Sequence, residues 1–361
     1  VKELKERRLR KLLRTLNGQA ITVVIDETGD RKKGKKTDYV SRQYLGSLGK
    51  VDNGIVSVNA YGVYKQISFP LIFKVFKPRA TLKATEKYQT KIELATEIIN
   101  KIIEFGFKIE LVLSDSLYGE SHQFIKKLEK YKLAYVVAIR SNHAVWLPSE
   151  QKVRANRWCK FERIFSNQKS ETRYIREIIY GKKRAVTYWE VTTDPETMPE
   201  NSTSFIMTNI QGKVKKTLGN LYGLRTWVEY GFRQCKQELG WTDYRLTSFK
   251  DIEKWWEIIF SVYTMVSLNS QPFLSIKPQK TSRVEKKDNA VNVSKHQQWD
   301  GGSGWKNTLN NLRLIVQPTL VLWLIFPWLE VFPNSKLLLG FNHLINLINQ
   351  HQPFYTSGQP A

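Results

Sequence analysis

The sequence has little cysteine, and this scarcity excludes several protein classes. Cys159 and Cys235 are the only two cysteines in 361 residues, which excludes a disulfide framework and indicates a reducing compartment. Cys235 falls inside a helical pattern and is interpreted as a buried structural thiol. The five histidines are scattered, so no Cys/His spacing typical of a zinc site occurs.

Long apolar runs are also missing from the sequence. The first residues, Val1–Leu16, are basic, but no apolar segment of about 7–15 residues follows, so no signal peptide is expected. The most apolar stretch, Pro318–Leu329, is shorter than the roughly 20 residues of a spanning helix, and Pro327 interrupts it. We interpret it as buried core, with a partner-docking surface as the alternative, and expect no membrane partner and a cytoplasmic location.

Positive charge, in contrast, is in large excess. Lys and Arg number 57 against 33 Asp and Glu, which gives a formal net charge of +24. A chain this basic attracts polyanions, because each neutralised phosphate releases condensed counterions. Nucleic acid is the leading partner class. An anionic membrane surface and packing within RNA are the alternatives.

Strands and helices alternate along the first part of the chain. This alternation implies a layered α/β core. Apolar, β-branched runs predict strands at Ala20–Asp26, Ile55–Tyr64, Gln66–Phe76, Ile109–Asp115 and Ala134–Ile139. Helical spacing of apolar residues predicts helices at Tyr88–Phe105 and Ser121–Tyr131.

The pattern changes after residue 145. Between Trp146 and Ile210 short strand-like runs alternate with turns, which predicts a β-rich insertion. Helical patterns return over Lys213–Leu239 and Asp251–Leu268. Ser275–Gly304 is polar and contains Gly and Ser, as in a loose linker, and the tail from Leu309 is apolar and helical.

Two acidic residues end apolar strands. Asp26 closes the run VVID, and Asp115 closes LVLSD. Acids at the carboxyl ends of core strands meet at one edge of a sheet, where their oxygens suit Mg²⁺. Two ions about 3.5–4 Å apart would clamp the attacking and leaving oxygens of a phosphoryl transfer. The alternative is that each acid only caps the next turn.

A third acid, Glu229, shares a helical pattern with other polar residues. If Tyr222–Leu239 is one helix, four polar residues fall within about a 60° arc beside its apolar stripe. They are Tyr222, Arg225, Glu229 and Lys236. Glu229 would be the third metal ligand, with Arg225 and Lys236 on DNA phosphates and Tyr222 as a hydrogen-bond donor. The alternative is that Arg225 and Glu229 only form an i,i+4 ion pair.

The four polar residues match Y-x2-R-x3-E-x6-K, the YREK signature of one large group of bacterial insertion-sequence transposases. With Asp26 and Asp115, the chain resembles the DDE transposases. The local contexts agree: Asp26 opens DETG before RKKGKK, Asp115 opens DSLYG with Tyr118–Gly119, and KQELGWTDYR follows Glu229. The resemblance covers about Ile21–Leu268.

The resemblance implies a fold and a division of the chain. The expected class is α/β, a ribonuclease H-like mixed sheet flanked by helices, interrupted by a β-rich insertion domain and followed by a helical C-terminal tail. The expected parts are a basic helical N-terminal remnant (1–20), the first part of the core (21–143), the β-rich insertion domain (144–212), the second part of the core with the YREK helix (213–272), a polar linker (273–308) and an apolar helical tail (309–361).

The resemblance also implies an activity. Asp26, Asp115 and Glu229 would be the catalytic residues and would hold two Mg²⁺ ions, with Mn²⁺ as a substitute and no small-molecule cofactor. Activated water would cleave DNA at the insertion-sequence end, and the freed 3′-OH would attack DNA again, giving cut-and-paste transposition. The implied partners are double-stranded DNA, at transposon ends and target, and a second copy in a homodimer. The implied location is the bacterial cytoplasm, in association with the nucleoid.

Further residues are expected to contact DNA. Besides Tyr222, Arg225 and Lys236, the basic segment after Asp26 supplies Lys33, Lys35, Lys36 and Arg42, for which a solvated basic loop is the alternative. In the YREK group a flipped base stacks on an aromatic residue of the insertion domain. The insertion aromatics considered for that role are Trp146, Trp158 and Trp189, with core packing as the alternative.

A truncated, catalytically incompetent DNA-binding remnant is the alternative function. Members of the DDE transposase family that this chain resembles carry an N-terminal region that helps bind transposon ends, whereas 25 residues precede Asp26 here. Val1–Leu16 would then be the last helix of that region. A membrane-associated basic protein is a third interpretation, which salt dependence would separate from the other two, because DNA binding weakens steeply with salt.

Overall fold

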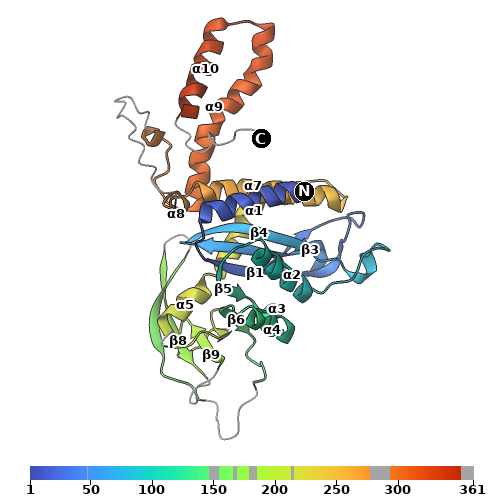
Figure 1. Cartoon of the computed structure of the whole chain (residues 1–361), viewed down its shortest axis with the longest axis vertical. Coiled ribbons are helices and arrows are strands. Elements are labelled where there is room, and N and C mark those ends of the chain that lie inside the picture. Colours follow the sequence, from blue (N-terminus) through green and yellow to red (C-terminus); the bar gives the residue numbers. More distant parts are fainter. Residues whose placement is uncertain are drawn as a thin grey trace. The chain divides into compact units, whose positions relative to one another are not determined.

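The structure is a computed structural model that describes residues 1–46, 48–145, 154–165, 169–178, 185–212, 215–276 and 293–350. The chain divides into two compact units, Val1–Leu268 and Asn269–Ala361. The first unit contains the sheet and the helices that cover it (Figure 1). All of the residues proposed above for catalysis belong to this unit.

One mixed sheet of ten strands, among the described residues, organises the first unit. The strands are β1 (Ile21–Arg31), β2 (Ser41–Leu45), β3 (Lys50–Tyr64), β4 (Ile67–Val75), β5 (Ile109–Ser114), β6 (Tyr135–Ile139), β7 (Cys159–Ile164), β8 (Ser170–Glu177), β9 (Thr187–Thr192) and β10 (Ser204–Thr208). Their order is β2-β3-β1-β5-β6-β10-β9-β8-β7, and β4 also pairs with β3. The pairs β1–β5 and β5–β6 are parallel, and the others are antiparallel.

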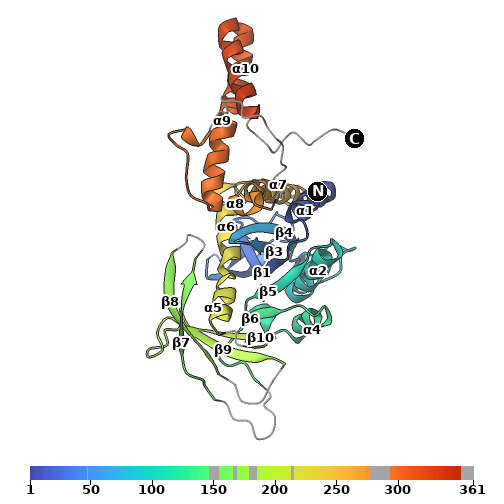
Figure 2. The same ribbon diagram turned by 60° about the vertical axis from the view of Figure 1, so that its left-hand side comes forward.

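Helices cover both faces of this sheet. They are α1 (Lys2–Leu16), α2 (Lys91–Glu104), α3 (Ser116–Gly119), α4 (His122–Lys130), α5 (Lys215–Gly223), α6 (Thr226–Glu238) and α7 (Phe249–Leu268), with a short 3₁₀ turn, η1 (Arg79–Thr81). Figure 2 shows α5 and α6 on one side of the central strands and α2 and α4 on the other. The expected α/β class, a mixed sheet flanked by helices, is confirmed.

Strand β1 runs through the middle of the core. Its first residues, Ile21–Ile25, are fully or almost fully buried because both faces of the strand are covered, which explains why four of the five are apolar, with Thr22 the exception. The expectation that this strand ends at Asp26 is wrong. It continues to Arg31, because β3 pairs with it as far as the Arg31–Gly54 step. Asp26 therefore lies in the middle of a strand.

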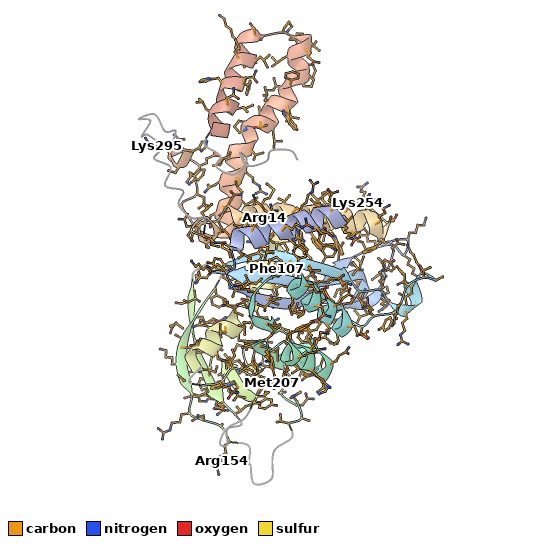
Figure 3. All side chains as sticks on the ribbon, in the orientation of Figure 1. Arg14, Phe107, Arg154, Met207, Lys254 and Lys295 are labelled. Atoms are coloured by element: carbon orange, nitrogen blue, oxygen red, sulfur yellow. The ribbon has the colours of Figure 1, made fainter. Side chains whose placement is uncertain are left out.

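Helix α1 packs into the first unit. Leu9, Leu12 and Leu16 are at most 2% exposed, and α1 lies beside α7. Arg14 and Lys254 are on the exposed sides of these two helices (Figure 3). Between the helices, the Arg8 guanidinium forms a buried ion pair with Glu257, with Nε and Oε1 2.6 Å apart.

The prediction of one helix over Tyr222–Leu239 is wrong. The helix breaks at residues 224–225, so Tyr222 ends near the close of α5, and Glu229 and Lys236 belong to α6. At the break the backbone tightens to i→i−3 bonds, such as Arg225 N to Tyr222 O at 3.0 Å. Thr226 Oγ1 also donates to Gly223 O at 2.9 Å, an alternative to the helical bond that bends the chain.

Helix α6 approaches the sheet through a glycine. A Cβ on Gly231 would lie 2.6 Å from Cε1 of the fully buried Tyr61 on β3. The Tyr61 hydroxyl is 3.3 Å from the thiol of Cys235, which is free and buried, as the sequence predicts. The spacing between α6 and β3 thus depends on the absence of a side chain at residue 231.

We expect Gly231→Ala to lower the free energy of unfolding by about 1–3 kcal/mol, because overpacking outweighs a gain in helix propensity of about 1 kcal/mol. Urea denaturation measures this change. Gly340→Ala is the matched control, since Gly340 is also helical and a Cβ there would meet nothing within 4 Å. Equal stability of the two variants would contradict the close contact.

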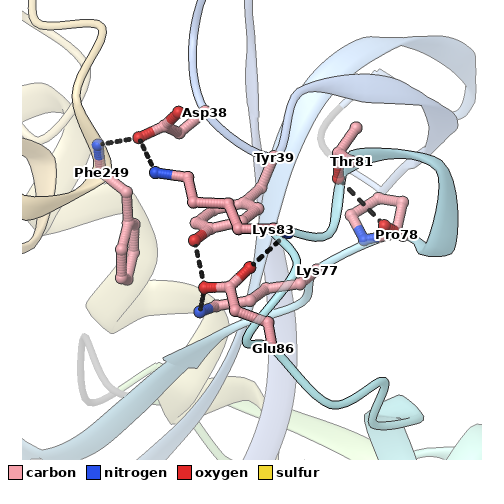
Figure 4. A network of polar contacts seen from close by, with 8 residues as sticks. All are labelled: Asp38, Tyr39, Lys77, Pro78, Thr81, Lys83, Glu86 and Phe249. Carbon is pink, nitrogen blue, oxygen red and sulfur yellow. Dashed lines mark hydrogen bonds and ion pairs between the residues drawn. The ribbon is translucent and has the colours of Figure 1, made fainter.

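A polar network holds the connection between β1 and β2 against α7 (Figure 4). Asp38 accepts hydrogen bonds from the Phe249 N–H at 2.9 Å and from Lys83 Nζ at 3.2 Å. The Tyr39 hydroxyl donates to Glu86, which also binds Lys77, both at 2.5 Å. The network fixes one end of the segment that carries the basic run after Asp26.

The second unit contains α8 (Gln271–Leu274), η2 (Val293–Lys295), α9 (Trp305–Val331) and α10 (Ser335–Gln350). The interpretation of Pro318–Leu329 as buried core is wrong: Trp323, Leu324 and Trp328 are 71%, 75% and 65% exposed. Helix α9 runs through both prolines. Among the described residues it alone is long and apolar enough to cross a membrane, a property that many core helices of other proteins share.

Candidate active site

Asp26 lies on β1, and Asp115 directly follows β5, the parallel strand next to β1. Ile25 pairs with Ser114 in the β1–β5 ladder, and each of these two residues is followed in the chain by one of the acids. Neighbouring strands are about 4.8 Å apart, which brings the two residues together. Asp115 also caps α3, because its Oδ1 accepts the Leu117 N–H at 3.1 Å. The capping alternative is therefore present at Asp115 alongside its position in the cluster.

Helix α6 contacts β1 and adds the third acid, Glu229. The Arg225 guanidinium lies between two of the carboxylates. Its Nη1 is 3.6 Å from Asp26 Oδ2, and its Nη2 is 3.0 Å from Glu229 Oε1. The i,i+4 ion pair considered as an alternative does form, but Arg225 reaches Asp26 as well. The cluster is thus held together by a side-chain cation.

The electrostatics of the cluster favour a bound cation. Burial raises the pKa of Asp26 to about 7, Arg225 opposes this shift, and Asp115 and Glu229 add to it. Burial also raises the pKa of Asp115, against the effect of Arg225. Burial alone would lower the pKa of Arg225, but Tyr222 and the three acids outweigh it. Additional positive charge would favour the ionised form of both aspartates.

The donor set fits a hard divalent ion in its chemistry. All three acids offer oxygen ligands, as Mg²⁺ prefers, and they lie close enough to shift the pKa of Asp26. Among the described residues, however, no three acidic, histidine or cysteine side chains already surround one point as metal ligands. Glu229 faces Arg225 instead, and because its side chain is 51% exposed it has room to turn. For Glu229 to join Asp26 and Asp115 around a metal ion, its side chain would have to rotate away from Arg225.

The other signature residues lie at different distances from this cluster. Tyr222 lines a cavity of about 410 Å³ together with Ser116, the residue after Asp115. Lys236 does not join the carboxylates, because its Nζ donates to Gly29 O on β1 at 2.8 Å. Burial lowers the pKa of Lys236. The structure therefore brings together Tyr222, Arg225 and the acids. Lys236, on α6, instead contacts β1 at Gly29, three residues after Asp26.

The basic residues after Asp26 are exposed. Lys33, Lys35 and Lys36 lie in the connection after β1, and Arg42 lies on β2. Arg31, at the end of β1, is five residues beyond Asp26, or about 16 Å along an extended strand.

The three insertion tryptophans have different surroundings. Trp146 lies outside the described residues. The Arg176 guanidinium lies over the Trp158 ring, with Cζ 4.2 Å from the ring centroid. Trp189 is 3% exposed and donates from Nε1 to Thr187 Oγ1 at 2.8 Å, so it packs in the core. The roles of these tryptophans in base stacking stay predictions.

Two residues beside the acids were given no role from the sequence, although Tyr118 belongs to the quoted Tyr118–Gly119 pair. Glu27 follows Asp26 and pairs with Lys91 Nζ at 2.6 Å. The Tyr118 hydroxyl is fully buried, has no hydrogen-bond partner among the described residues, and lies near the carboxylates of Glu27 and Asp115. The position of Glu27 next to Asp26 was the available signal. The orientation of Tyr118 depends on packing that the sequence does not display.

Two solved structures are similar in part. The Drosophila P element transposase strand transfer complex has 13% identity over 33% of this chain and 23% of that chain, with a TM-score of 0.17. The NurA nuclease from Sulfolobus solfataricus has 12% identity over 68% of this chain and 85% of that chain, with a TM-score of 0.28. At these TM-scores neither likeness carries an argument about this chain.

Sequence similarity is much stronger. The family described as DDE superfamily endonuclease matches residues 1–163. The probable transposase for insertion sequence element IS701 from Microchaete diplosiphon is 52% identical over 254 residues, which are 70% of this chain and 67% of that protein. With this identity over two thirds of a transposase, the chain belongs to the DDE superfamily endonucleases, among the insertion-sequence transposases.

Proposed function

We propose that the chain is a Mg²⁺-dependent transposase that cleaves DNA at the ends of its insertion sequence and transfers the freed strand. The observation that carries this proposal is the gathering of Asp26, Asp115 and Glu229 from three separate elements around the Arg225 guanidinium. Three acids gathered in a chain of charge +24 are poorly explained by stability alone, since burial raises the pKa of two of them.

Each residue of the cluster has a role in this proposal. Asp26, Asp115 and Glu229 would hold two ions, which when bound supply activation of water and charge compensation at the reacting phosphate. Arg225, released by Glu229, would present its planar fork to a DNA phosphate. Tyr222 lines the cavity next to Asp115 and would donate a hydrogen bond to the same backbone.

DNA is the substrate in this proposal, and a second copy of the chain is the proposed partner on paired ends. The excess of 24 positive charges supports binding to a polyanion. Lys33, Lys35, Lys36 and Arg42 are exposed and would extend the contact beyond the acids. Lys236 would act indirectly, because it fixes β1 at Gly29 close to Asp26.

Cleavage of the element's own end sequence by the purified chain tests the proposal. We expect cutting with Mg²⁺, none with EDTA, and a loss of about 10³-fold or more in Glu229→Ala, since a metal ligand contributes several kcal/mol to the barrier. Glu104→Ala, which removes an exposed acid of α2, is the matched control and should cut normally. If the wild type binds this DNA but never cuts it, the chain is a DNA-binding remnant instead.

A further inference from the structure

Strand β7 of the insertion reaches the junction between α5 and α6. Two glycines on one face of α5 allow this approach. A Cβ on Gly219 would lie 2.3 Å from the Phe161 ring, and a Cβ on Gly223 would lie 3.2 Å from Arg163 Nε. Phe161 and Arg163 share one face of β7, so the strand lies against α5 with Arg163 at the helix end.

Arg163 is a half-buried cation without a carboxylate partner. Among the described residues its guanidinium forms no ion pair, and its Nε has no hydrogen-bond acceptor. Its Nη2 is 3.4 Å from Thr226 Oγ1, and the guanidinium lies over the Phe165 ring at 4.9 Å. Burying an unpaired guanidinium is unfavourable, so an anion at this position would be strongly bound.

The surroundings of Arg163 are positive. Burial lowers the pKa of Arg163, and Arg173 and Arg225 lower it further, whereas Glu171 and Tyr222 oppose them. Arg173 is already paired with Glu171 at 2.6 Å, and Arg225 with Glu229 and Asp26. The first turn of α6 adds the positive end of a helix of 13 residues.

We propose that Arg163 binds a DNA backbone phosphate next to the active site, so that strand β7 of the insertion supplies part of the substrate interface. The proposal rests on the proposed function, because it takes the anion to be the transposase's own DNA. Arginine suits this ligand, since Nε and one Nη together match two phosphate oxygens. Tyr222 and Arg225, which lie close to Arg163, would engage the neighbouring part of the same strand.

Binding to phosphate-modified DNA tests the proposal. Duplexes with the element's end sequence carry a neutral methylphosphonate at one position each, and affinity is measured in EDTA, so that no cleavage occurs. For wild type, we expect one position to weaken binding about tenfold, the loss of one charge-assisted contact. Arg163→Met should bind unmodified DNA about tenfold more weakly, lose nothing more at that position, and show a salt slope smaller by about one.

Lys160→Met is the matched control, because Lys160 is an exposed cation on the other face of β7. It should keep the wild-type loss at the modified position. Arg163→Lys keeps the charge without the fork and provides a second variant, with thermal melting of each variant to verify folding. The proposal would be overturned if, at every methylphosphonate position, the Arg163 variants lost as much additional DNA affinity as the wild type does. If coupling between Arg163 and one phosphate is found but the wild type never cuts the same DNA in the separate assay with Mg²⁺, only the proposed catalysis is overturned.

Discussion

The Asp26→Asn variant is expected to lose DNA cleavage and to unfold less readily than the wild type when no metal is present. Loss of cleavage follows from its proposed role as a metal ligand. The gain in stability follows from burial, because Asp26 is 9% exposed and its pKa is raised to about 7. An ionised Asp26 therefore destabilises the metal-free fold at neutral pH, and an amide of the same shape does not.

The sign of the pH dependence follows from the same values. Between the ordinary aspartate pKa of 3.8 and the raised pKa of about 7, the folded protein keeps a proton on Asp26 that the unfolded chain has released. Wild-type stability from this group therefore falls as pH rises through that window, by roughly 4 kcal/mol in total, and is constant below it. The advantage of Asp26→Asn should be largest above pH 7 and disappear near pH 4.

Urea denaturation at a series of pH values, in EDTA and in Mg²⁺, measures this effect. Mg²⁺ should reverse the order of stability, because it binds the folded wild type and stabilises it by mass action. Asp38→Asn is the control, and its effect on the free energy of unfolding at neutral pH should have the opposite sign. The Phe249 N–H holds the pKa of Asp38 below its ordinary value, so the ionised form of Asp38 stabilises the fold. A wild type more stable than Asp26→Asn in EDTA at pH 8 would contradict the burial of this charge.

Separating Arg8 from Glu257 is expected to destabilise the fold as strongly as any single substitution in the chain. Both side chains are at most 2% exposed, and Arg8 also donates to Pro70 O at 2.6 Å and Leu71 O at 2.9 Å. Removing one partner of a buried pair leaves the other charge uncompensated, which costs about 3–5 kcal/mol. Glu257→Leu should therefore lower the free energy of unfolding by that amount.

Chemical denaturation of three variants separates charge from packing. Arg8→Met combined with Glu257→Leu should recover most of the loss, because apolar residues of similar volume replace such pairs at little cost. Glu3→Gln removes the acid from the exposed Arg7–Glu3 pair on the same helix and should change stability very little. If the double variant is as unstable as Glu257→Leu, then packing and the carbonyl contacts of Arg8, not the unpaired charge, dominate.

Most of the core strands and helices could be predicted because their signals are local. Ile21–Ile25 is β-branched throughout and apolar except for Thr22, and the helical spacing over Tyr88–Phe105 contains α2 with its Thr90–Glu93 capping box. The proximity of Asp26 and Asp115 followed from the parallel arrangement of their strands. Strand β2 was missed because it is short and largely exposed, and so lacks an apolar period.

The parts that could not be predicted depend on contacts far apart in the sequence. The break near Arg225 leaves the helical spacing of apolar residues unchanged, so this spacing alone predicts one helix. Gly219 and Gly223 resemble ordinary weak helix positions until Phe161 and Arg163 are seen against them. An apolar run such as Pro318–Leu329 indicates a helix, but it does not indicate what covers that helix.

The separation of Asp26 from Glu229 along the chain also sets an order of events during synthesis. The two residues are 203 positions apart, a span that a ribosome translates in roughly 10–40 s at about 5–20 residues per second. Arg8 must wait longer still, because its partner Glu257 is among the last residues of the first unit. We therefore expect a nascent chain to gain the proposed cleavage activity only after Glu229 on α6 has been synthesised, and α1 to reach its partner helix α7 later still.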